Sequence, residues 1–489
     1  MWRRLAEHQS QCSSLQIKIG VVLIMLRRHS FIIIDVALKV FFFVFTYRAS
    51  RLLSHSDFDL LSYFRSTLTM CAGFASSSAS LFYLIYSRKI FKSVKYRKIY
   101  IITPLFFYLT LLTIVLIVTY AASTIFRLDQ IFNLTGAPLF FSAIVFTSMS
   151  QLALFFGKAM GVVSPKTSIL VILSLFVNFF FGSILIAHYG LSGSIAYISL
   201  GYGCVVPIIL SRYIKPLLND PPKLRTPKYS TILKSWIHIR RFLLPNMLES
   251  AFSILAPWLA VYFLVRNVGT TGVGPMLYYQ AIIGLSAFFI QSIVTNIHTG
   301  YTEDNSGSEI ALKKFRHIYI IFFALETLIA GGFSHEFQDI LNLHTLDPYA
   351  LFFIYAASLL QSELVAKGMA FKKAGKNRKA LIHNTLCSLA LVFGSLIATL
   401  FAGLNGYPIA VFIARLTAYV YISVDYRFTF SSKSPPFWKE NIFFMLAFFA
   451  LIHRFFYQGI ISVIAALLCV VVLFLKIKSF YKDKRTLLP

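Results

Sequence analysis

Long apolar runs, separated by short basic gaps, follow one another from residue 30 to residue 476. A helix that crosses a bilayer needs about 20 predominantly apolar residues, and most of these runs reach that length. They predict spans at 30–50, 60–87, 99–122, 137–156, 167–188, 193–211, 242–265, 273–297, 317–334, 349–370, 380–402, 407–424, 441–457 and 459–476. The pattern therefore predicts an all-α polytopic membrane protein with about 14 transmembrane helices.

Lysine and arginine residues are distributed unevenly between the two sides of this arrangement. The chain ends and the alternate gaps, with the span ends beside them, hold 38 of the 46 basic residues. The opposite side has only five, all near helix ends: Arg48, Arg51, Arg127, Arg266 and Arg454. Cytoplasmic loops carry the excess of positive charge in membrane proteins. Because an even number of spans returns the chain to its starting side, we expect both termini in the cytoplasm.

The longest gap, residues 212–241, holds eight basic residues and a proline cluster. It predicts a cytoplasmic linker, whose second half has the composition of an amphipathic helix at the membrane surface. The expected segments are a cytoplasmic N-terminal segment (1–29), an N-lobe of six spans (30–211), the basic linker (212–241), a C-lobe of six spans (242–424), two further spans (425–476) and a cytoplasmic tail (477–489).

The two predicted lobes resemble each other in sequence. Counterparts at an offset of 215 are Arg51, Ser54, Phe58, Asp59 and Tyr63 in the first lobe and Arg266, Gly269, Val273, Gly274 and Tyr278 in the second. Later, Phe181-Gly182-Ser183 recurs as Phe393-Gly394-Ser395, and Gly190-x-x-Gly193 recurs as Gly403-x-x-Gly406. Six helices return the chain to its starting side, so the lobes are expected to be parallel repeats. Transporters with such repeats bind their substrate at the repeat interface.

Composition and charge exclude several classes of protein. With 57% hydrophobic and 13% charged residues, the chain is neither an ordinary soluble protein nor a disordered one. The net charge of +28 would favour nucleic acid in a soluble domain, but here it lies in the gaps between spans. We therefore expect contact with membrane lipids and no nucleic acid. The five cysteines are scattered and predict neither a metal site nor a disulfide framework.

Two regions resemble the bacterial O-antigen and polysaccharide lipid flippases (Wzx-type). The turn Leu53-Ser54-His55-Ser56-Asp57-Phe58 is similar to the turn after the first span of that family, which usually continues with Gly where this chain has Asp59. The stretch from Gly157 to the Tyr189-Gly190-Leu191-x-Gly193 turn resembles the region of the fifth and sixth spans. This family belongs to the multidrug, oligosaccharidyl-lipid and polysaccharide exporter superfamily, and the likeness extends over essentially the whole chain.

The resemblance implies a transporter and not an enzyme. Such a flippase moves an undecaprenyl-pyrophosphate-linked oligosaccharide, the O-antigen repeat unit of lipopolysaccharide, from the cytoplasmic to the periplasmic leaflet by alternating access. It implies a multi-pass protein of the bacterial inner membrane, with a polysaccharide polymerase and a chain-length regulator as partners. The self-contained two-lobe layout predicts a monomer. No catalytic residue, metal or other cofactor is expected, apart from coupling to H⁺ or Na⁺.

Three basic residues within predicted spans are candidates for holding the pyrophosphate: Lys39, Arg65 and Arg415. Charged groups are costly in lipid, and they usually face a cavity or a partner. A guanidinium binds phosphate oxygens in a bidentate manner. The alternatives are structural: Lys39 pairs with Asp35 four residues earlier, Arg65 reaches the outer surface, and Arg415 lies in a buried ion pair.

The acidic residues within spans are candidates for coupling to an ion. They are Asp35, Glu249, Glu326 and Glu363. A carboxylate in a membrane domain can bind a proton or a cation, because burial favours its neutral form. The alternative is that each of them pairs with a buried lysine or arginine as fixed structure.

Two other functional classes compete with the flippase. A multidrug cation antiporter of the same superfamily would need an acidic cavity, whereas Lys39, Arg65 and Arg415 favour an anionic substrate. A membrane glycosyltransferase that uses lipid-linked sugars would place an acidic pair in the first outer loop, where Asp57 and Asp59 stand. The six-plus-six repeat and the short outer loops argue against this enzyme.

Overall fold

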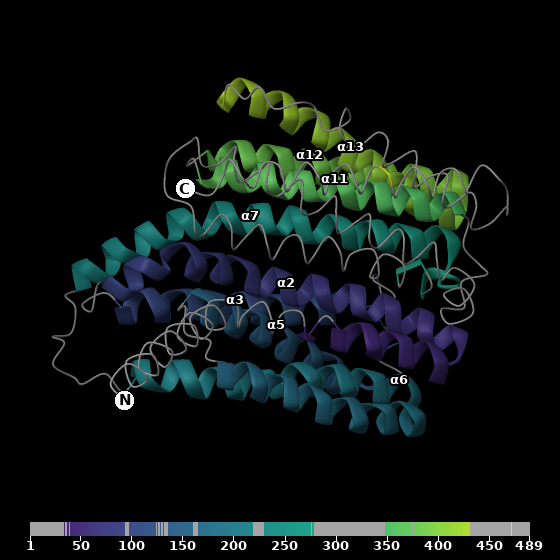
Figure 1. The fold of residues 1–489 in the computed structure, drawn as a ribbon, viewed down its shortest axis with the longest axis horizontal. Coiled ribbons are helices and arrows are strands. Elements are labelled where there is room, and N and C mark those ends of the chain that lie inside the picture. The colour runs from purple at the N-terminus through teal and green to yellow at the C-terminus, as the bar shows by residue number, and fades with distance from the viewer. Residues whose placement is uncertain are drawn as a thin grey trace, which may run out of the picture. The chain divides into compact units, whose positions relative to one another are not determined.

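The computed structural model describes residues 40–92, 97–123, 135–159, 165–218, 229–274, 348–373 and 376–430, with a few single positions besides. Within these ranges the regular structure is helical and contains no strand (Figure 1). The helices are α2 (His55–Lys92), α3 (Arg97–Ala121), α5 (Ala137–Ala159), α6 (Pro165–Leu218), α7 (Tyr229–Val268), α11 (Pro348–Lys373), α12 (Asn377–Ala402), the short 3₁₀ helix η1 (Gly403–Asn405) and α13 (Gly406–Phe430).

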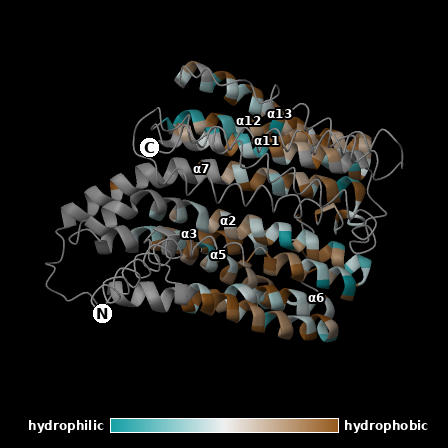
Figure 2. Cartoon of the chain, in the orientation of Figure 1, coloured by the Kyte–Doolittle hydropathy of each residue, from teal (hydrophilic) through white to brown (hydrophobic). Residues whose placement is uncertain are grey.

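The helices have the surface of a membrane protein. Stretches long and apolar enough to cross a bilayer lie at Thr103–Ala121, Ala137–Leu154, Ser168–Ile208, Ala251–Val268 and Arg378–Tyr426. Large apolar side chains such as Phe180, Phe401 and Phe428 are exposed, and Figure 2 shows hydrophobic residues along α6. Water would not tolerate so much exposed apolar surface. The predicted fold class, an all-α polytopic membrane protein, is confirmed; the number of fourteen spans stays a prediction.

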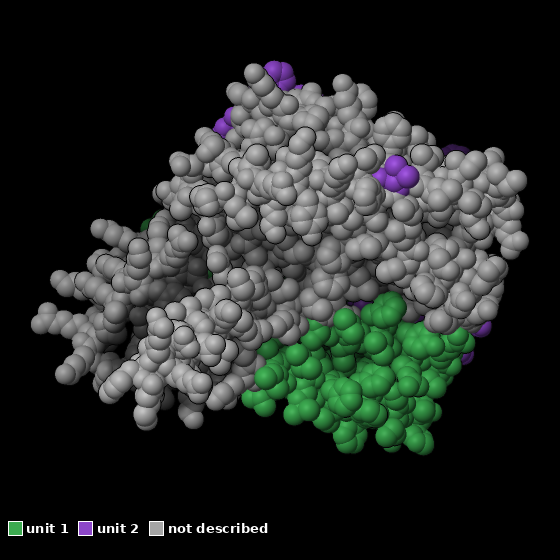
Figure 3. Space-filling view, in the orientation of Figure 1, with its two compact units in different colours: residues 1–53, 67–250 green, residues 54–66, 251–489 purple. Residues whose placement is uncertain are grey.

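The chain divides into two compact units, which Figure 3 distinguishes by colour. Unit 1 comprises residues 1–53 and 67–250, and unit 2 comprises residues 54–66 and 251–489. The boundary falls inside two helices. The first residues of α2 belong to unit 2 and the rest of this helix to unit 1, while α7 passes from unit 1 to unit 2 at Ser250.

Helix α7 begins within the predicted linker. Residues 229–241 and the predicted span 242–265 form one continuous helix, Tyr229–Val268. A helix satisfies its backbone hydrogen bonds internally, so it can leave the bilayer without a break. The second half of the linker is therefore helical as expected, but it extends the span directly.

Polar side chains join the helices of unit 1. The hydroxyl groups of Tyr108 and Ser148 are 2.8 Å apart and connect α3 with α5. Ser76 of α2 donates to Gln151 of α5 at 2.8 Å. Hydrogen bonds between helices hold membrane bundles together where the hydrophobic effect does not.

Helix α6 is a hairpin whose two legs meet at Gly190. This residue has φ 53° and ψ −126°, a conformation that only glycine adopts without strain. The legs then pack so closely that a Cβ atom on Gly193 would lie 1.9 Å from the carbonyl oxygen of Leu185. Two predicted spans, 167–188 and 193–211, thus form one tightly closed pair.

The same turn recurs between α12 and α13. Gly403 has φ 55° and ψ −131°, and a Cβ atom on Gly406 would lie 2.1 Å from the carbonyl oxygen of Ala398. Leu185 and Ala398, whose carbonyl oxygens lie closest to these positions, are 213 positions apart, as are the corresponding glycines of the two turns. The Gly-x-x-Gly pattern that repeats in the sequence therefore builds the same backbone geometry twice.

In unit 2 the helices α11, α12 and α13 pack against one another. Helix α7 joins this group through two polar contacts. Ser388 of α12 donates to the carbonyl oxygen of Phe252 at 3.0 Å, and Asn267 donates to Thr399 at 2.9 Å. The buried charged residues described below lie in this bundle.

Candidate functional site

Several of the predicted site residues lie outside the part that the structure describes. This holds for Asp35, Lys39 and Glu326. Glu249 belongs to α7, but the position of its side chain is not described. The described candidates are Arg65, Glu363 and Arg415.

Arg65 and Arg415 are both half-buried, and both lie in unit 2. Arg65 lies in the part of α2 that clusters with this unit. Arg415 lies on α13, on the same helix face as the buried residues Val411, Ala418 and Ile422. A cation on the packed face of a membrane helix points toward protein or a water-filled space and away from lipid.

Glu363 lies on α11 and is fully buried, next to a buried lysine of the same helix. Its carboxylate is 3.4 Å from the ammonium of Lys367, which is 3% exposed. Residues four apart share a helix face, so this spacing brings the two charges together. Lys367 is absent from the predicted residues because it lies near the end of the predicted span 349–370, beside a basic gap. Its four-residue distance from Glu363 was the available signal.

Helix α13 completes the surroundings of Lys367. The ammonium donates to Ser423 at 2.7 Å and lies 4.4 Å from the centre of the Tyr419 ring. Such a position over an aromatic face stabilises a cation by electrostatic attraction. Arg415, Tyr419 and Ser423 follow one another at four-residue spacing, so they form one stripe of α13. Lys367 of α11 thus meets the same stripe that carries Arg415.

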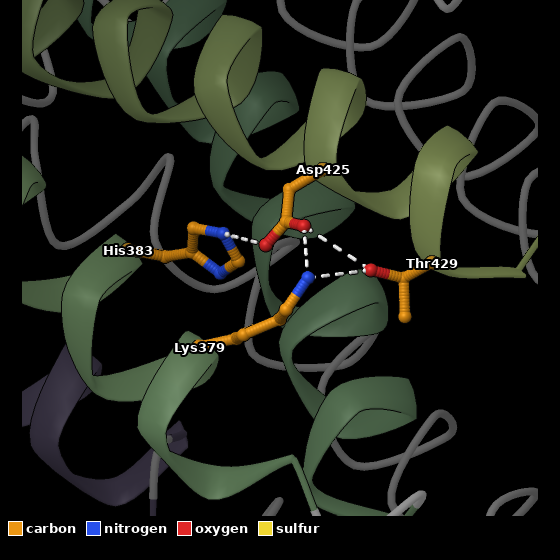
Figure 4. A network of polar contacts seen from close by, with 4 residues as sticks. All are labelled: Lys379, His383, Asp425 and Thr429. Carbon is orange, nitrogen blue, oxygen red and sulfur yellow. Dashed lines mark hydrogen bonds and ion pairs between the residues drawn. The ribbon is translucent and has the colours of Figure 1, made fainter.

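A second polar network joins α12 and α13 in unit 2 (Figure 4). The Asp425 carboxylate binds the ammonium of Lys379 through one oxygen and is 3.1 Å from Nε2 of His383 through the other. Thr429 donates to the same carboxylate at 3.1 Å and accepts from Lys379 at 2.8 Å. The network connects the first turns of α12 to the last turns of α13.

His383 is the most buried member of this network. It is 2% exposed, and its ring packs against Phe371 and Tyr421 at centroid distances of 5.1 and 5.3 Å. Neither His383 nor Asp425 was predicted as a site residue. Both lie at helix ends beside basic gaps, and they are 42 positions apart, so no local spacing connects them.

A third polar contact involves Asp59 at the start of α2. One carboxylate oxygen accepts the N–H of Gly274 at 2.7 Å, and the other accepts the N–H of Gly272 at 3.1 Å. Burial raises the pKa of this carboxyl, while the two N–H groups and the charge of His55 act in the opposite direction. Because both oxygens are occupied by backbone donors, Asp59 is built into the structure and is a poor candidate for the acidic catalyst of a glycosyltransferase.

The described ranges contain no cluster of side chains that could bind a metal ion. No group of three or more histidine, cysteine, aspartate or glutamate side chains comes together there. The described polar clusters pair carboxylates with lysine, histidine or backbone N–H groups. Their chemistry is that of ion pairs and hydrogen bonds.

No protein-family model and no curated protein matches the chain. Solved structures do match it. The structure "Lipid II flippase MurJ, inward closed conformation" aligns with a TM-score of 0.59 and 14% identity, over 94% of this chain and 99% of that chain. "Crystal structure of MATE in complex with MaL6" aligns with a TM-score of 0.55 and 14% identity, over 84% of this chain and 98% of that chain. A MOP superfamily transporter from Pyrococcus furiosus aligns with a TM-score of 0.53 and 16% identity, over 84% of this chain and 98% of that chain.

At these identities the matches define the fold. The chain is a multi-pass membrane protein with the fold of MOP-superfamily transporters. The expected fold is thus confirmed, and the neighbours named in these matches are a flippase and transporters.

Proposed function

We propose that this protein is a flippase that moves an undecaprenyl-pyrophosphate-linked oligosaccharide, an O-antigen repeat unit, from the cytoplasmic to the periplasmic leaflet. The observation that carries the proposal is the extent of the flippase match. The lipid II flippase covers 94% of this chain, whereas the MATE structure covers 84%. The additional coverage favours an architecture with spans beyond the two six-helix lobes. Alternating access between two repeats supplies the mechanism.

The substrate assignment rests on charge. A pyrophosphate brings negative charge into the membrane domain, and Lys39, Arg65 and Arg415 supply positive charge in spans. Arginine binds phosphate through two parallel hydrogen bonds, which fixes the carrier while the sugars pass. We assign the polymerase and the chain-length regulator as the proteins that receive the flipped unit.

Coupling to H⁺ or Na⁺ is assigned to the acidic residues Asp35, Glu249, Glu326 and Glu363. Glu363 has the geometry on which such coupling can act, because its charge is balanced by Lys367 at 3.4 Å inside the protein. A buried ion pair is strongly weakened when one partner loses its charge. Proton uptake by Glu363 would therefore release the Lys367 ammonium.

A multidrug antiporter is the second candidate, favoured by the MATE matches. The Pyrococcus furiosus transporter is described by the words "Reverse polarity of binding pocket suggests different function", so pocket charge varies within this fold. The cations Arg65 and Arg415 support the anionic substrate over the cationic drug. Location in the bacterial inner membrane follows from the same assignment.

The lipid profile of cells that lack the protein tests the proposal. In a strain that makes the corresponding surface polysaccharide, deletion should cause complete lipid-linked repeat units to accumulate, shielded from the periplasmic face. Units that lack a sugar would indicate a glycosyltransferase. An unchanged lipid profile with altered drug tolerance would indicate the antiporter.

Alanine at Arg65 or Arg415 should reduce export of the repeat unit about tenfold or more, because a hydrogen bond to a charged group contributes about 1.5–3 kcal/mol. Export is measured as surface polysaccharide in the deletion strain complemented with each variant. Arg378→Ala is the matched control, since this arginine is exposed at the start of α12. Normal export by both variants, at normal protein levels in the membrane, would move the phosphate site elsewhere.

Reporter fusions test the orientation on which this direction of transport depends. A reporter joined after residue 225 or after residue 489 should report the cytoplasm, because both positions lie in the basic gaps. A reporter that is active only in the periplasm should give no signal at either site. A periplasmic signal at one of them would invert the topology.

A further inference from the structure

The contact of Asp59 with the loop 269–274 depends on the fold of that loop. Gly269 and Gly272 have positive φ angles of 92° and 81°, which fold the loop so that two N–H groups point to one carboxylate. The N–H of Val273, between them, donates instead to the carbonyl oxygen of Thr270 at 3.1 Å. Each N–H from Gly272 to Gly274 thus has an acceptor, and Asp59 supplies two of the three bonds.

Gly274 leaves the space that the carboxylate fills. A Cβ atom on Gly274 would lie 2.7 Å from an Asp59 oxygen and 2.7 Å from the Phe58 ring. No other residue fits there without displacing both side chains. Asp59 is 5% exposed, so water is largely excluded from these bonds.

Asp59 and Gly274 are also counterparts in the internal repeat, since they are 215 positions apart. The two turns that follow equivalent spans therefore lie against each other in unit 2. At such a meeting point two equal side chains would collide, whereas an acidic residue on one turn and a glycine on the other interlock. Asp59 stands where the flippases that the chain resembles usually have glycine, and its carboxylate fills the space that Gly274 leaves.

The contact lies within unit 2, to which the start of α2 belongs. Residues 54–66 are the part of the chain before residue 251 that clusters with unit 2, although α2 continues without interruption into unit 1. On the predicted topology this end faces the periplasm, because Arg51 and Arg266 lie in the gaps with few basic residues. A flippase has to open this end once in every cycle to release its product.

We propose that Asp59 is a positioning residue of the transport cycle, a latch that holds residues 54–66 against the loop 269–274 while the periplasmic end is closed and releases them when it opens. This inference rests on the proposed function. The closed contact needs the ionised carboxylate, in which both oxygens accept hydrogen bonds. A protonated carboxyl group carries a hydrogen on one oxygen, and that oxygen then acts as a donor. Burial of the charged carboxylate costs free energy, which opposes closure. The two hydrogen bonds from Gly272 and Gly274 offset this cost in the closed state, and the carboxylate is hydrated again when the contact opens.

A labelling experiment without substrate tests the latch. In a chain whose five cysteines are replaced by serine, Val273→Cys places a buried thiol between the two glycines that bind Asp59. With Asp59→Ala the rate of reaction with a membrane-impermeant maleimide should rise about tenfold or more, because two charge-assisted hydrogen bonds are lost. Asp59→Glu should restore part of the protection, and Asp57→Asn, two residues away, should leave it unchanged.

A second reporter separates opening from unfolding. Ala260→Cys lies in the buried part of α7 and should stay unreactive in all variants. If Asp59→Ala exposes both thiols, the residue stabilises the whole unit and the latch is refuted. If it exposes neither, the contact holds nothing closed and the latch is refuted as well. Exposure of the thiol at position 273 alone supports the proposal, whatever the substrate is.

A covalent lock distinguishes a latch from a permanent brace. Cysteines at positions 59 and 274 replace the two partners of the contact, and oxidation should join them. Export by the oxidised protein should stop and return after reduction, while the Asp59→Cys variant alone, which keeps Gly274 and has no second thiol at the contact, should not respond to oxidant. Undiminished export by the cross-linked protein would show that this end stays closed throughout the cycle, and would overturn the proposal.

Discussion

Lys367→Met is expected to lower the free energy of unfolding by about 3–5 kcal/mol, because it removes the positive charge beside the buried Glu363 carboxylate. Glu363 is fully buried, and the ammonium of Lys367 lies 3.4 Å from its carboxylate. Methionine retains the length of the lysine side chain, so packing against Tyr419 changes little. The measurement is denaturant or thermal unfolding of the purified full-length protein in detergent.

The double variant Glu363→Gln with Lys367→Met provides the control. Removing both charges together avoids the uncompensated ion, and replacement of a whole buried pair by neutral groups is often close to neutral. The double variant should therefore be more stable than Lys367→Met alone. Arg378→Met, at an exposed position, should change stability by less than about 0.5 kcal/mol. A double variant as unstable as the sum of both single variants would contradict a direct pair.

Gly406→Ala is expected to destabilise the protein by about 3 kcal/mol, the upper part of the range for overpacked sites. The new Cβ atom would lie 2.1 Å from the carbonyl oxygen of Ala398 and 2.6 Å from the nitrogen of Thr399. Both are backbone atoms, which cannot rotate away as a side chain can. Gly193→Ala should behave alike, because its Cβ atom would lie 1.9 Å from the equivalent oxygen of Leu185. Apparent melting temperatures of the two variants measure the effect.

Gly368→Ala is the matched control for these glycines. It lies within α11, and a Cβ atom there would meet nothing within 4 Å. Alanine favours a helix over glycine by about 1 kcal/mol, so this variant should be slightly more stable than the parent. Equal losses at Gly368 and Gly406 would mean that helix propensity, and not contact between the two legs, sets the outcome.

The helices could largely be predicted from the apolar runs. The predicted span 380–402 corresponds to α12, which begins three residues earlier at Asn377. The Gly-x-x-Gly repeat was also visible in the sequence, and the backbone angles of Gly190 and Gly403 agree within a few degrees. Each of these features depends on residues that are close together in the chain, which is why sequence patterns suffice.

The buried charges were harder to predict. Glu363 was recognisable because an acidic residue in an apolar run is rare, but its pairing with Lys367 was not predicted. Tyr419 and Ser423 of α13, which contact Lys367, lie more than fifty positions away in the sequence. His383 and Asp425 lie at helix ends, where charged residues are ordinary, and their contact spans 42 positions. Nothing in local hydropathy separates such residues from the basic ones that only mark the cytoplasmic side.

Membrane insertion, helix positions and the expected orientation therefore follow from the order of residues, because lipid acts on each apolar run separately and charge asymmetry is a sum over gaps. The partners of the polar groups depend on how helices far apart in the chain come together. Asp59 illustrates this difference. In the sequence it was an acidic residue in an outer turn and a departure from glycine, and its two bonds to Gly272 and Gly274 exist only because the fold brings two repeat-related turns into hydrogen-bond contact.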